Sequence, residues 1–338
     1  SFYNIAAPFK WVLMKLHFGI VGFGHIGRKH LASIQKHTQA VVVAICDPNV
    51  TQSEIENIPV YSDIHTMLSH HPEIEVVNIC TPNGLHATNA IACISEGKHV
   101  VVEKPICLTK KDAESLIFHA LNKHVKVFCV MQNRYTSNAR FLKQLIDSNN
   151  LGYIHEIDVQ LVWNRDKRYY LNPDGSRHSW RGSLEYDGGP LFTQFSHFVD
   201  LLYWLFGDLT IGYAQKYNVQ HPYVPEIEDS GLFTFRTESG AHGVFNYSIN
   251  APYKNLISRV SILGEKGVIE VSGQYLEVIN QYYSDNLLEN QFPILDNSNT
   301  HSLVIKNVIE AINSGNNIDT NAMEGLKIVE IIENVYRQ

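Results

Sequence analysis

Lys104 is the first residue whose surroundings could support chemistry. It follows the hydrophobic run 100–102 and stands between Glu103 and Pro105. An amine at the end of a buried strand can donate hydrogen bonds to negative charge that develops on a substrate oxygen. A solvated lysine at a strand end would have the same sequence, so the rest of the chain has to decide between the two interpretations.

A second candidate lies in the segment 187–202, where His197 follows Thr193 and Gln194. Histidine titrates nearest to neutral pH, which suits it to a proton-transfer step. The pattern of 190–206 predicts a helix, on which Thr193 and His197 share a face. The alternative is a histidine that only packs on an amphipathic helix.

Gly22, Gly24 and Gly27 form the motif GxGxxG between a β-rich run and a helical one. The first glycine permits a tight turn, the second lets a pyrophosphate approach the backbone, and the third lets helix and strand pack closely. The helix N-terminus adds free N–H donors. We therefore expect a dinucleotide to contact the residues of this loop, which are Gly22, Phe23, Gly24, His25 and Ile26. A glycine turn without a ligand is the alternative.

Asp47 ends the second β-rich run, about twenty residues after Gly27. A carboxylate there accepts hydrogen bonds from the ribose hydroxyls of NAD and repels the additional phosphate of NADP. No arginine directly follows Asp47, so the sequence predicts NAD as the cofactor.

The elements that must position these residues alternate along the first part of the chain. Apolar runs at 17–21, 41–46, 76–80, 100–102 and 125–130 alternate with helical patterns at 26–36, 64–69, 85–95 and 111–122. This alternation predicts a parallel sheet with helical crossovers. Ligands bind at the carboxyl ends of such strands, so the residues that end two of the runs converge on one crevice; they are Thr81, Pro82, Asn83, Glu103 and Lys104.

The pattern changes after a helix at 139–148. Strand patterns follow at 156–163, 211–219, 230–236, 243–249, 258–263, 268–271 and 276–279, with helices at 190–206, 301–313 and 323–337. Such a succession predicts a mainly antiparallel sheet with helices. We assign 14–134 to an NAD-binding Rossmann domain and 135–338 to a substrate-binding domain, and interpret 1–13 as a leader or upstream remnant.

Composition excludes several classes of protein. The length of 338 residues fits two domains, and the net charge of −7 argues against nucleic-acid binding. No apolar run is long enough to cross a membrane. The five cysteines contain no CxxC pair, which favours reduced, buried thiols and a cytoplasmic protein. Neither these cysteines nor the histidine pairs match the spacing of a metal site, so no metal is expected.

Three motifs together carry a resemblance to the glucose–fructose oxidoreductase/inositol dehydrogenase (Gfo/Idh/MocA) family. They are GxGxxG followed by His30, Thr81-Pro82-Asn83 with His86, and Glu103-Lys104-Pro105. The resemblance implies a Rossmann domain, a second α/β domain with an open antiparallel sheet, and a redox reaction at a sugar carbon. It also implies that Lys104 contacts the substrate hydroxyl and the nicotinamide ribose, and that the peptide bond to Pro105 is cis. The open sheet face would be buried between subunits of a homodimer or homotetramer.

The expected cofactor contacts extend beyond the glycine loop and Asp47. They include residues that follow the third, fourth and fifth runs, namely Thr81, Pro82, Asn83, His86, Glu103, Lys104 and Gln132.

A second set of segments narrows the resemblance to a subgroup. The segments 162–170, 180–183, 187–202 and 262–267 are similar to bacterial UDP-N-acetyl-glucosaminuronate 3-dehydrogenases, which act in making surface-polysaccharide (lipopolysaccharide) sugars.

One position departs from the family pattern, which has Asp, or in this subgroup Asn, four residues before the histidine. Thr193 stands there, and a threonine cannot act as a carboxylate base.

The resemblance implies that a hydride leaves a sugar carbinol, and the candidate residues can be given roles in that step. His197 is expected to be the general base, and Lys104 the hydrogen-bonding and electrostatic partner of the oxygen. Thr193 or Gln194 would orient the substrate. The nicotinamide carries the redox chemistry itself.

Basic and aromatic residues are interleaved between 165 and 181. The basic residues outnumber the acids there, and arginine forks match phosphate and carboxylate groups. A nucleotide sugar acid carries both groups, so Arg165, Tyr169 and Arg181 are candidate substrate ligands, with Lys104, Thr193, Gln194 and His197 at the reacting end. A solvated loop or a subunit contact is the alternative.

The sequence therefore predicts NAD-dependent oxidation of a sugar hydroxyl, at C3 of a UDP-linked acetamido-uronate. Two alternatives stay open. One is a dehydrogenase of a free sugar or cyclitol such as an inositol, which would not need the arginine cluster. The other is a non-catalytic NAD-binding sensor of sugar nucleotides, favoured by the departure at Thr193 and opposed by the presence of Lys104 and His197.

Overall fold

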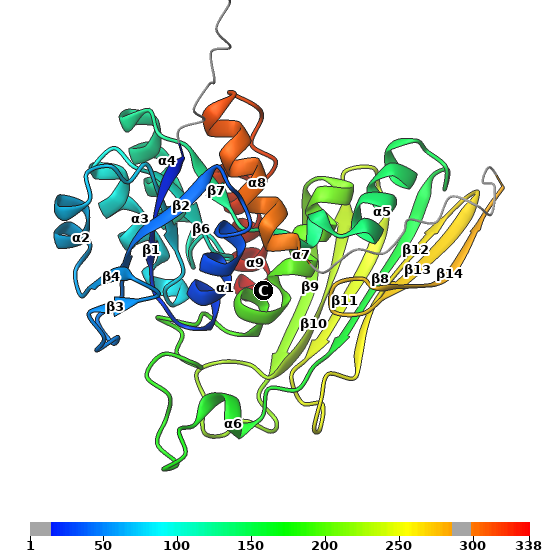
Figure 1. Cartoon of the computed structure of the whole chain (residues 1–338). Coiled ribbons are helices and arrows are strands. Elements are labelled where there is room, and N and C mark those ends of the chain that lie inside the picture. The colour runs from blue at the N-terminus through cyan, green and yellow to red at the C-terminus, as the bar shows by residue number, and fades with distance from the viewer. Residues whose placement is uncertain (1–14, 286–298) are drawn as a thin grey trace, which may run out of the picture.

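The computed structural model describes residues 15–285 and 299–338, which contain two seven-stranded sheets side by side (Figure 1). The first sheet has the strand order β3-β4-β2-β1-β5-β6-β7. Its strands are β1 (Leu16–Val21), β2 (Ala40–Cys46), β3 (Glu54–Ile55), β4 (Ile58–Tyr61), β5 (Val76–Ile79), β6 (His99–Val102) and β7 (Val127–Cys129). All neighbours pair in parallel except β3 and β4. The predicted parallel Rossmann sheet is confirmed.

Helices follow the strands of this sheet. They are α1 (His25–Ile34), α2 (Ile64–His70), the 3-10 turn η1 (Asn83–Leu85), α3 (His86–Ser95) and α4 (Lys110–Lys123). Side chains close two of the N-termini: Asp63 accepts the Thr66 N–H, and Thr109 accepts the Asp112 N–H. The short strands β3 and β4 were not predicted, because neither has a long apolar or alternating run.

The second sheet has the order β14-β13-β12-β8-β11-β10-β9. Its strands are β8 (Ile154–Val162), β9 (Leu209–Tyr217), β10 (Ser230–Thr237), β11 (His242–Ser248), β12 (Ile257–Gly264), β13 (Gly267–Ser272) and β14 (Val278–Ser284). Only β8 and β11 pair in parallel, so the mainly antiparallel sheet is confirmed. The prediction of a strand at 276–279 was wrong in its bounds. Leu276 has φ +58° and lies before the strand, and the edge strand then runs on through polar residues.

The helices of the second half do not all cover one face of this sheet, because a long one lies between the two sheets and a short one lies below the strand ends in the view of Figure 1. They include the 3-10 turn η2 (Gln132–Tyr135), α5 (Ser137–Asp147), α6 (Lys167–Tyr170) and α7 (Ser196–Phe206). The predicted regular helix over 190–206 was wrong in its first part, because a π-helical turn, η3 (Leu191–Phe195), precedes α7. Gly188 and Gly189, both with positive φ, and Pro190 lead into this turn, and π-turns occur frequently at functional sites.

The last two helices, α8 (Thr300–Asn313) and α9 (Ala322–Arg337), return to the first sheet. Val304, Ile305 and Val308 of α8 share a core with residues of β1, including Phe18. The residues just before α9 lie beside β7, the edge strand of the first sheet. There the Cys129 N–H donates to the Thr320 carbonyl oxygen at 2.9 Å. The domain division at 134/135 stays a prediction, and the segment 1–13 lies outside the described residues.

The strands of the second sheet alternate between buried and exposed residues. In β11 the residues His242, Val244 and Asn246 are exposed, while Phe245 and Tyr247 between and after them are buried. One face therefore packs on the core and the other is open to solvent. Among the described residues, no helix is both long and apolar enough to span a membrane.

Candidate active site

The glycine loop between β1 and α1 has the geometry that a dinucleotide requires. Gly22 has φ +87°, and a Cβ there would lie 2.7 Å from the backbone of Cys80. A Cβ on Gly27 would lie 2.1 Å from the Gly22 carbonyl oxygen. A Cβ on Gly24 would meet no atom within 4 Å, so this glycine borders open space at the helix N-terminus. No side chain caps that end of α1, which leaves its N–H groups free for a pyrophosphate.

Asp47 lies at the carboxyl end of β2, beside the same loop. Its Oδ2 accepts the Phe23 N–H at 2.7 Å, and its Oδ1 accepts the Asn49 N–H at 2.9 Å. These bonds fix the carboxylate next to the glycine loop, and its side chain is only partly buried. The loop and the acid together fit the pyrophosphate and ribose of NAD.

The ends of β5 and β6 meet the second half of the chain at Thr193. Lys104 Nζ donates to the Thr193 carbonyl oxygen at 2.6 Å. Asn83 Nδ2 donates to the Asp187 carbonyl oxygen at 2.8 Å and to Thr193 Oγ1 at 3.1 Å. The Lys104-Pro105 peptide bond is cis, as the resemblance implied. Residues about ninety positions apart thus meet between the two sheets at the carboxyl ends of β5 and β6, where sheets of this kind bind their ligands, and we call this junction the crevice.

His197 lies in the first turn of α7, four residues after the threonine that holds Lys104. Its Nε2 lies 3.3 Å from Nε2 of Gln132, and its Nδ1 has no hydrogen-bond partner among the described residues. Burial, with a further contribution from Lys104, lowers the pKa of His197 well below its usual value. The imidazole is therefore neutral at neutral pH and can accept a proton.

Lys104 is partly buried beside these groups. Burial lowers the pKa of its amine, although Glu103 and Asp187 act in the opposite direction. The predicted reacting residues Lys104, Thr193 and His197 are thus brought together, with Gln132 as their neighbour.

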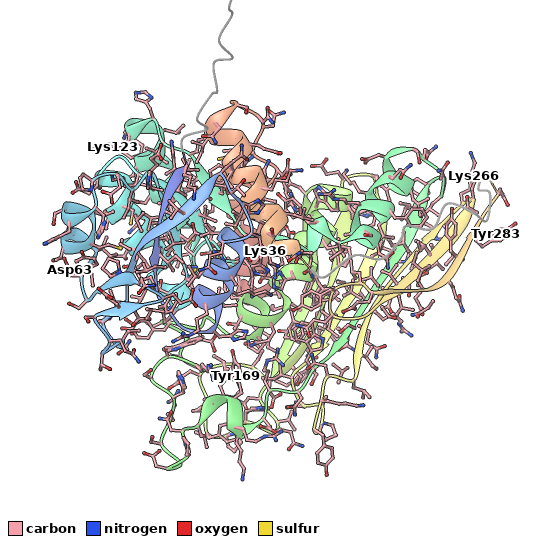
Figure 2. The ribbon with its side chains drawn as sticks, in the orientation of Figure 1. Lys36, Asp63, Lys123, Tyr169, Lys266 and Tyr283 are labelled. Carbon is pink, nitrogen blue, oxygen red and sulfur yellow. The ribbon has the colours of Figure 1, made fainter. Side chains whose placement is uncertain are left out.

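Arg165, Tyr169 and Arg181 form a second group next to the first. The Arg181 guanidinium lies 4.6 Å from the centre of the Tyr169 ring, and that of Arg165 lies 5.5 Å from it. Gln194 Nε2 donates to the Tyr169 hydroxyl at 3.3 Å. Figure 2 labels Tyr169 near the junction of the two halves of the molecule. All four predicted substrate ligands of this group are therefore neighbours.

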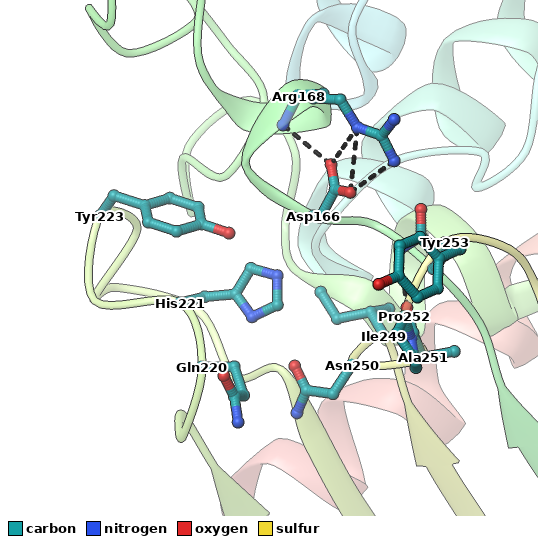
Figure 3. Close-up of a pocket in the computed structure, with 11 residues that line it drawn as sticks. Asp166, Arg168, Gln220, His221, Tyr223, Ile249, Asn250, Ala251, Pro252 and Tyr253 are labelled. Atoms are coloured by element: carbon teal, nitrogen blue, oxygen red, sulfur yellow. Dashed lines mark hydrogen bonds and ion pairs between the residues drawn. The ribbon is translucent and has the colours of Figure 1, made fainter.

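The other arginines of the same stretch are neutralised by acids. Arg168 pairs with Asp166 at 2.6 Å, as Figure 3 shows, and Arg177 pairs with Glu226 at 2.5 Å. Within the described ranges, neither Arg165 nor Arg181 forms a salt bridge. Their charges are thus available to a ligand.

A cavity of about 410 Å³ lies beside this loop (Figure 3). Its eleven lining residues include Asp166, Arg168, His221 and Tyr253, and none of the predicted site residues. His221 supports the site from this side, because its Nε2 lies 2.7 Å from the Arg165 carbonyl oxygen.

Comparison with known proteins agrees with this geometry. A family model described as the oxidoreductase family with an NAD-binding Rossmann fold matches residues 16–131, and the Gfo/Idh/MocA C-terminal domain model matches 139–270. The chain belongs to the Gfo/Idh/MocA family. It is an NAD-dependent dehydrogenase of the class that acts on sugars and polyols.

Two solved family members and one curated relative illustrate the range of substrates. The WlbA dehydrogenase from Bordetella pertussis, in complex with NADH and UDP-GlcNAcA, is 30% identical with a TM-score of 0.89, covering 96% of this chain and 95% of that one. WlbA from Chromobacterium violaceum, with the same two ligands, is 31% identical with a TM-score of 0.87, covering 96% and 93%. Inositol 2-dehydrogenase of Salmonella paratyphi B is 25% identical over 89% of this chain and 87% of its own length.

In this family member, Glu103 belongs to a buried ion-pair cluster that the sequence did not reveal. Its Oε1 lies 2.8 Å from Nε2 of His30 and 3.6 Å from Nε2 of His301. Burial opposes the charge on His30, but its contacts with Cys80 and Glu103 outweigh burial and raise the pKa to about 10. Burial also opposes the Glu103 carboxylate, yet its hydrogen bond with His30 and the nearby His301 hold its pKa well below the usual value.

This cluster also bears on metal binding. The ligand atoms of His30, Glu103 and His301 lie within 4.8 Å of one another. A protonated His30 has no free lone pair at Nε2, so the cluster fits an ion pair better than a metal site. That no metal is needed stays a prediction.

One further predicted residue, His86, lies between the ends of β5 and β6. His86 is buried, and its ring nitrogens lie 2.7 and 2.9 Å from the carbonyl oxygens of Pro105 and Thr81. It therefore holds the ends of β5 and β6 together. Whether it touches the cofactor stays a prediction.

Sequence reasoning missed Asp187. Its side chain is 1% exposed, its Oδ2 accepts the Gly182 N–H at 2.7 Å, and its Oδ1 accepts the Thr193 hydroxyl. The available signal was an acid directly before Gly188 and Gly189, a pair that bends the chain sharply.

Proposed function

We propose that the protein oxidises the C3 hydroxyl of UDP-linked N-acetyl-glucosaminuronate (UDP-GlcNAcA) with NAD. The observation that carries the proposal is the position of Arg165 and Arg181, whose guanidinium groups both lie against the Tyr169 ring. Neither arginine forms a salt bridge with an acid among the described residues. Guanidinium groups bind phosphate and carboxylate through paired hydrogen bonds. The substrate named in both WlbA complexes carries a diphosphate and a carboxylate, which supports the same ligand here.

The reaction assigns a task to each side chain at the crevice. His197 accepts the proton of the C3 hydroxyl, because burial keeps its imidazole neutral. Lys104 donates a hydrogen bond to the same oxygen and stabilises the negative charge that develops there. Thr193 and Gln194 orient the sugar ring. The nicotinamide, when bound, accepts the hydride from C3.

The cofactor side of the crevice is formed by the glycine loop and strand ends. Gly22, Phe23, Gly24, His25 and Ile26 border the pyrophosphate, and Asp47 binds the ribose. Thr81, Pro82, Asn83, Glu103 and Gln132 close the nicotinamide end.

A substrate panel tests the proposal. Full-length protein is mixed with NAD and UDP-GlcNAcA, UDP-GlcNAc, free GlcNAc or myo-inositol, and the absorbance of the reduced cofactor is followed. We expect turnover with UDP-GlcNAcA and much slower turnover with UDP-GlcNAc, which lacks the carboxylate. Turnover of myo-inositol without turnover of UDP-GlcNAcA would overturn the substrate assignment and leave the dehydrogenase.

Substitution of the two arginines tests, in the same assay, whether their side chains bind the substrate. Arg165→Met and Arg181→Met should each raise KM for UDP-GlcNAcA. Arg168→Met is the matched control, because that arginine is already paired with Asp166 and should leave KM unchanged. A thermal shift gives a second reading, since a ligand at one hundred times its Kd adds about 2.7 kcal/mol of stability.

The second candidate is a free cyclitol, and the inositol dehydrogenase relatives favour it. A free cyclitol carries no charge for Arg165 and Arg181 to bind. The panel above separates the two candidates directly.

The cellular setting follows from the proposed substrate. We infer a cytoplasmic role in surface-polysaccharide sugar synthesis, because nucleotide sugars are its activated precursors. The exposed face of the second sheet, which carries Val244, supports a homodimer or homotetramer in which that face is covered. Light scattering of the purified protein measures the oligomeric state.

A further inference from the structure

Asp187 is a buried carboxylate without a basic partner in direct contact. It is 1% exposed, and it forms no salt bridge within 15–285 and 299–338. Its hydrogen bonds come from the Gly182 N–H and the Thr193 hydroxyl. Burial raises the pKa of this carboxyl, while its hydrogen bonds and the nearby cations Lys104 and Arg181 act in the opposite direction and favour the carboxylate.

Lys104 is the cation bound to the same residue. Its Nζ donates to the Thr193 carbonyl oxygen at 2.6 Å, while Asp187 accepts the hydroxyl of that threonine. Asn83 fixes the arrangement, because its Nδ2 donates to both Thr193 Oγ1 and the Asp187 carbonyl oxygen. One threonine therefore links the amine on one side to the carboxylate on the other.

Glu103 also raises the pKa of Lys104, ahead of Asp187, but its carboxylate is already paired with histidines. His30 lies 2.8 Å from its Oε1 and His301 lies 3.6 Å from the same atom. The remaining charged or titratable groups that face Lys104 in the described part of the chain are Asp187, His197, His86, Arg165 and Cys129. Asp187 is the only carboxyl group among these described groups, and it forms no salt bridge. It also faces Arg181, Tyr169 and Tyr170.

We propose that Asp187 is the counter-charge of Lys104, linked to it through Thr193, and that it keeps this amine protonated in the crevice. Asp187 is then a positioning residue, which acts on the reacting oxygen only through Lys104. The inference rests on the proposed role of Lys104 in the dehydrogenase, but not on the identity of the sugar. Asp187 raises the pKa of the Lys104 amine, and Lys104 lowers the pKa of the Asp187 carboxyl. Each group therefore favours the charged form of the other.

The first test titrates Lys104 without any substrate. An amine-reactive reagent is applied across a range of pH, and labelling of Lys104 is measured by peptide mass spectrometry. In Asp187→Asn we expect the midpoint of labelling to fall by roughly one pH unit or more, because the amine has lost its counter-charge. Asp166→Asn, which removes an acid from the exposed pair with Arg168, is the control and should not move it.

The second test uses the turnover of whichever sugar or polyol the protein oxidises. The alkaline limb of the pH profile should move to lower pH in Asp187→Asn, while NAD binding is retained. An unchanged labelling midpoint overturns the proposal even if the protein is an active enzyme. Absence of turnover on the whole substrate panel overturns the proposed function and leaves the labelling test valid.

A third measurement covers an Asp187 variant that does not fold. Lys104→Met leaves the Asp187 carboxylate buried without a counter-charge. The pKa of the carboxyl then rises further above its unfolded value, so the folded state loses stability as pH rises. We expect the loss of Tm relative to wild type to be larger at about pH 8 than at about pH 5. An equal loss at both values overturns the proposal.

Discussion

Burial sets the charge of the two side chains that meet at the crevice. Burial holds the pKa of His197 low, and Lys104 donates to the carbonyl oxygen of Thr193. The two residues come from different halves of the chain and act on one oxygen in the proposed reaction. Single-residue changes should therefore alter rate or pH dependence more than folding.

Substitution of His197 by alanine is expected to reduce kcat by about 10²–10⁴-fold, the usual contribution of a positioned general base. Stability and NAD binding should change little, since the Nδ1 of this ring has no partner among the described residues. Initial rates with saturating substrate, together with a thermal shift by NAD, measure both effects. His119→Ala on α4 is the control; a kcat equal to that of this control would remove His197 from the reaction.

The pH dependence of kcat should be bell-shaped. Burial and Lys104 lower the pKa of His197 well below 6.5, so the neutral base persists below pH 6.5 and the acid limb lies below that value. Burial lowers the pKa of Lys104 from 10.5, so the protonated amine is lost, and the alkaline limb begins, below 10.5. Steady-state rates across this range provide the check. An acid limb above 6.5 would contradict the assignment of His197 as the base.

The sequence located the candidate site residues in the fold where a motif is local, while their roles stay predictions. The glycine loop, Asp47 and the Glu103-Lys104-Pro105 end lie where the spacing placed them. Asp187 was missed, because its role depends on a contact with Thr193 and on a bond from Asn83, about a hundred positions away. No pattern within a short window contains the bond from Asn83.

At the scale of elements, the turn from β1 into α1 contains one glycine that the fold requires and one that the proposed cofactor site requires. Gly27 packs against the carbonyl of Gly22, whereas Gly24 borders open space. The two glycines of the same motif should therefore respond differently to the same substitution.

Gly27→Ala is expected to lower the Tm of the protein without ligand, because its Cβ would lie 2.1 Å from the Gly22 oxygen. Gly24→Ala should leave that Tm unchanged but weaken NAD binding on the order of tenfold, about 1.4 kcal/mol, since the methyl occupies the approach of the pyrophosphate. Thermal denaturation and NAD titration of both variants test the pair. Equal loss of Tm in both would show that the open space at Gly24 is not a ligand site.

Element prediction failed where the backbone departs from a regular period. The π-turn before α7 keeps the apolar composition of a helix, so its sequence reads as one. The edge strand β14 has an exposed, polar face and therefore lacks an apolar run. Both departures lie where tertiary packing, rather than local preference, decides the conformation.

At the scale of the whole molecule, a buried charge cluster joins η2, α7 and α9. Arg134 is 4% exposed and binds Asp200, 1% exposed, through Nε and Nη2. Its Nη1 donates to Glu324 at 2.8 Å. Arg134 thus fixes α7, which carries His197, to the last helix of the chain.

Arg134→Met is expected to cost about 3–5 kcal/mol of unfolding free energy, because it leaves Asp200 buried and unpaired. Urea denaturation measures the change. Lys306→Ala is the control, since its pair with Glu310 is exposed and worth about 0.3–0.5 kcal/mol. The double variant Arg134→Met/Asp200→Leu should recover part of the loss. A small effect of Arg134→Met alone would mean that the cluster does not stabilise the fold.

The return of α8 and α9 to the first sheet makes the second sheet an insertion within the Rossmann half. Val304, Ile305 and Val308 complete a core that begins at β1, more than half the sequence away. Recombination between relatives that exchanges sugar specificity therefore needs two crossover points, one after β7 and one ahead of α8. A single crossover would graft a foreign pair of helices onto the native nucleotide-binding core and leave its apolar surface poorly matched.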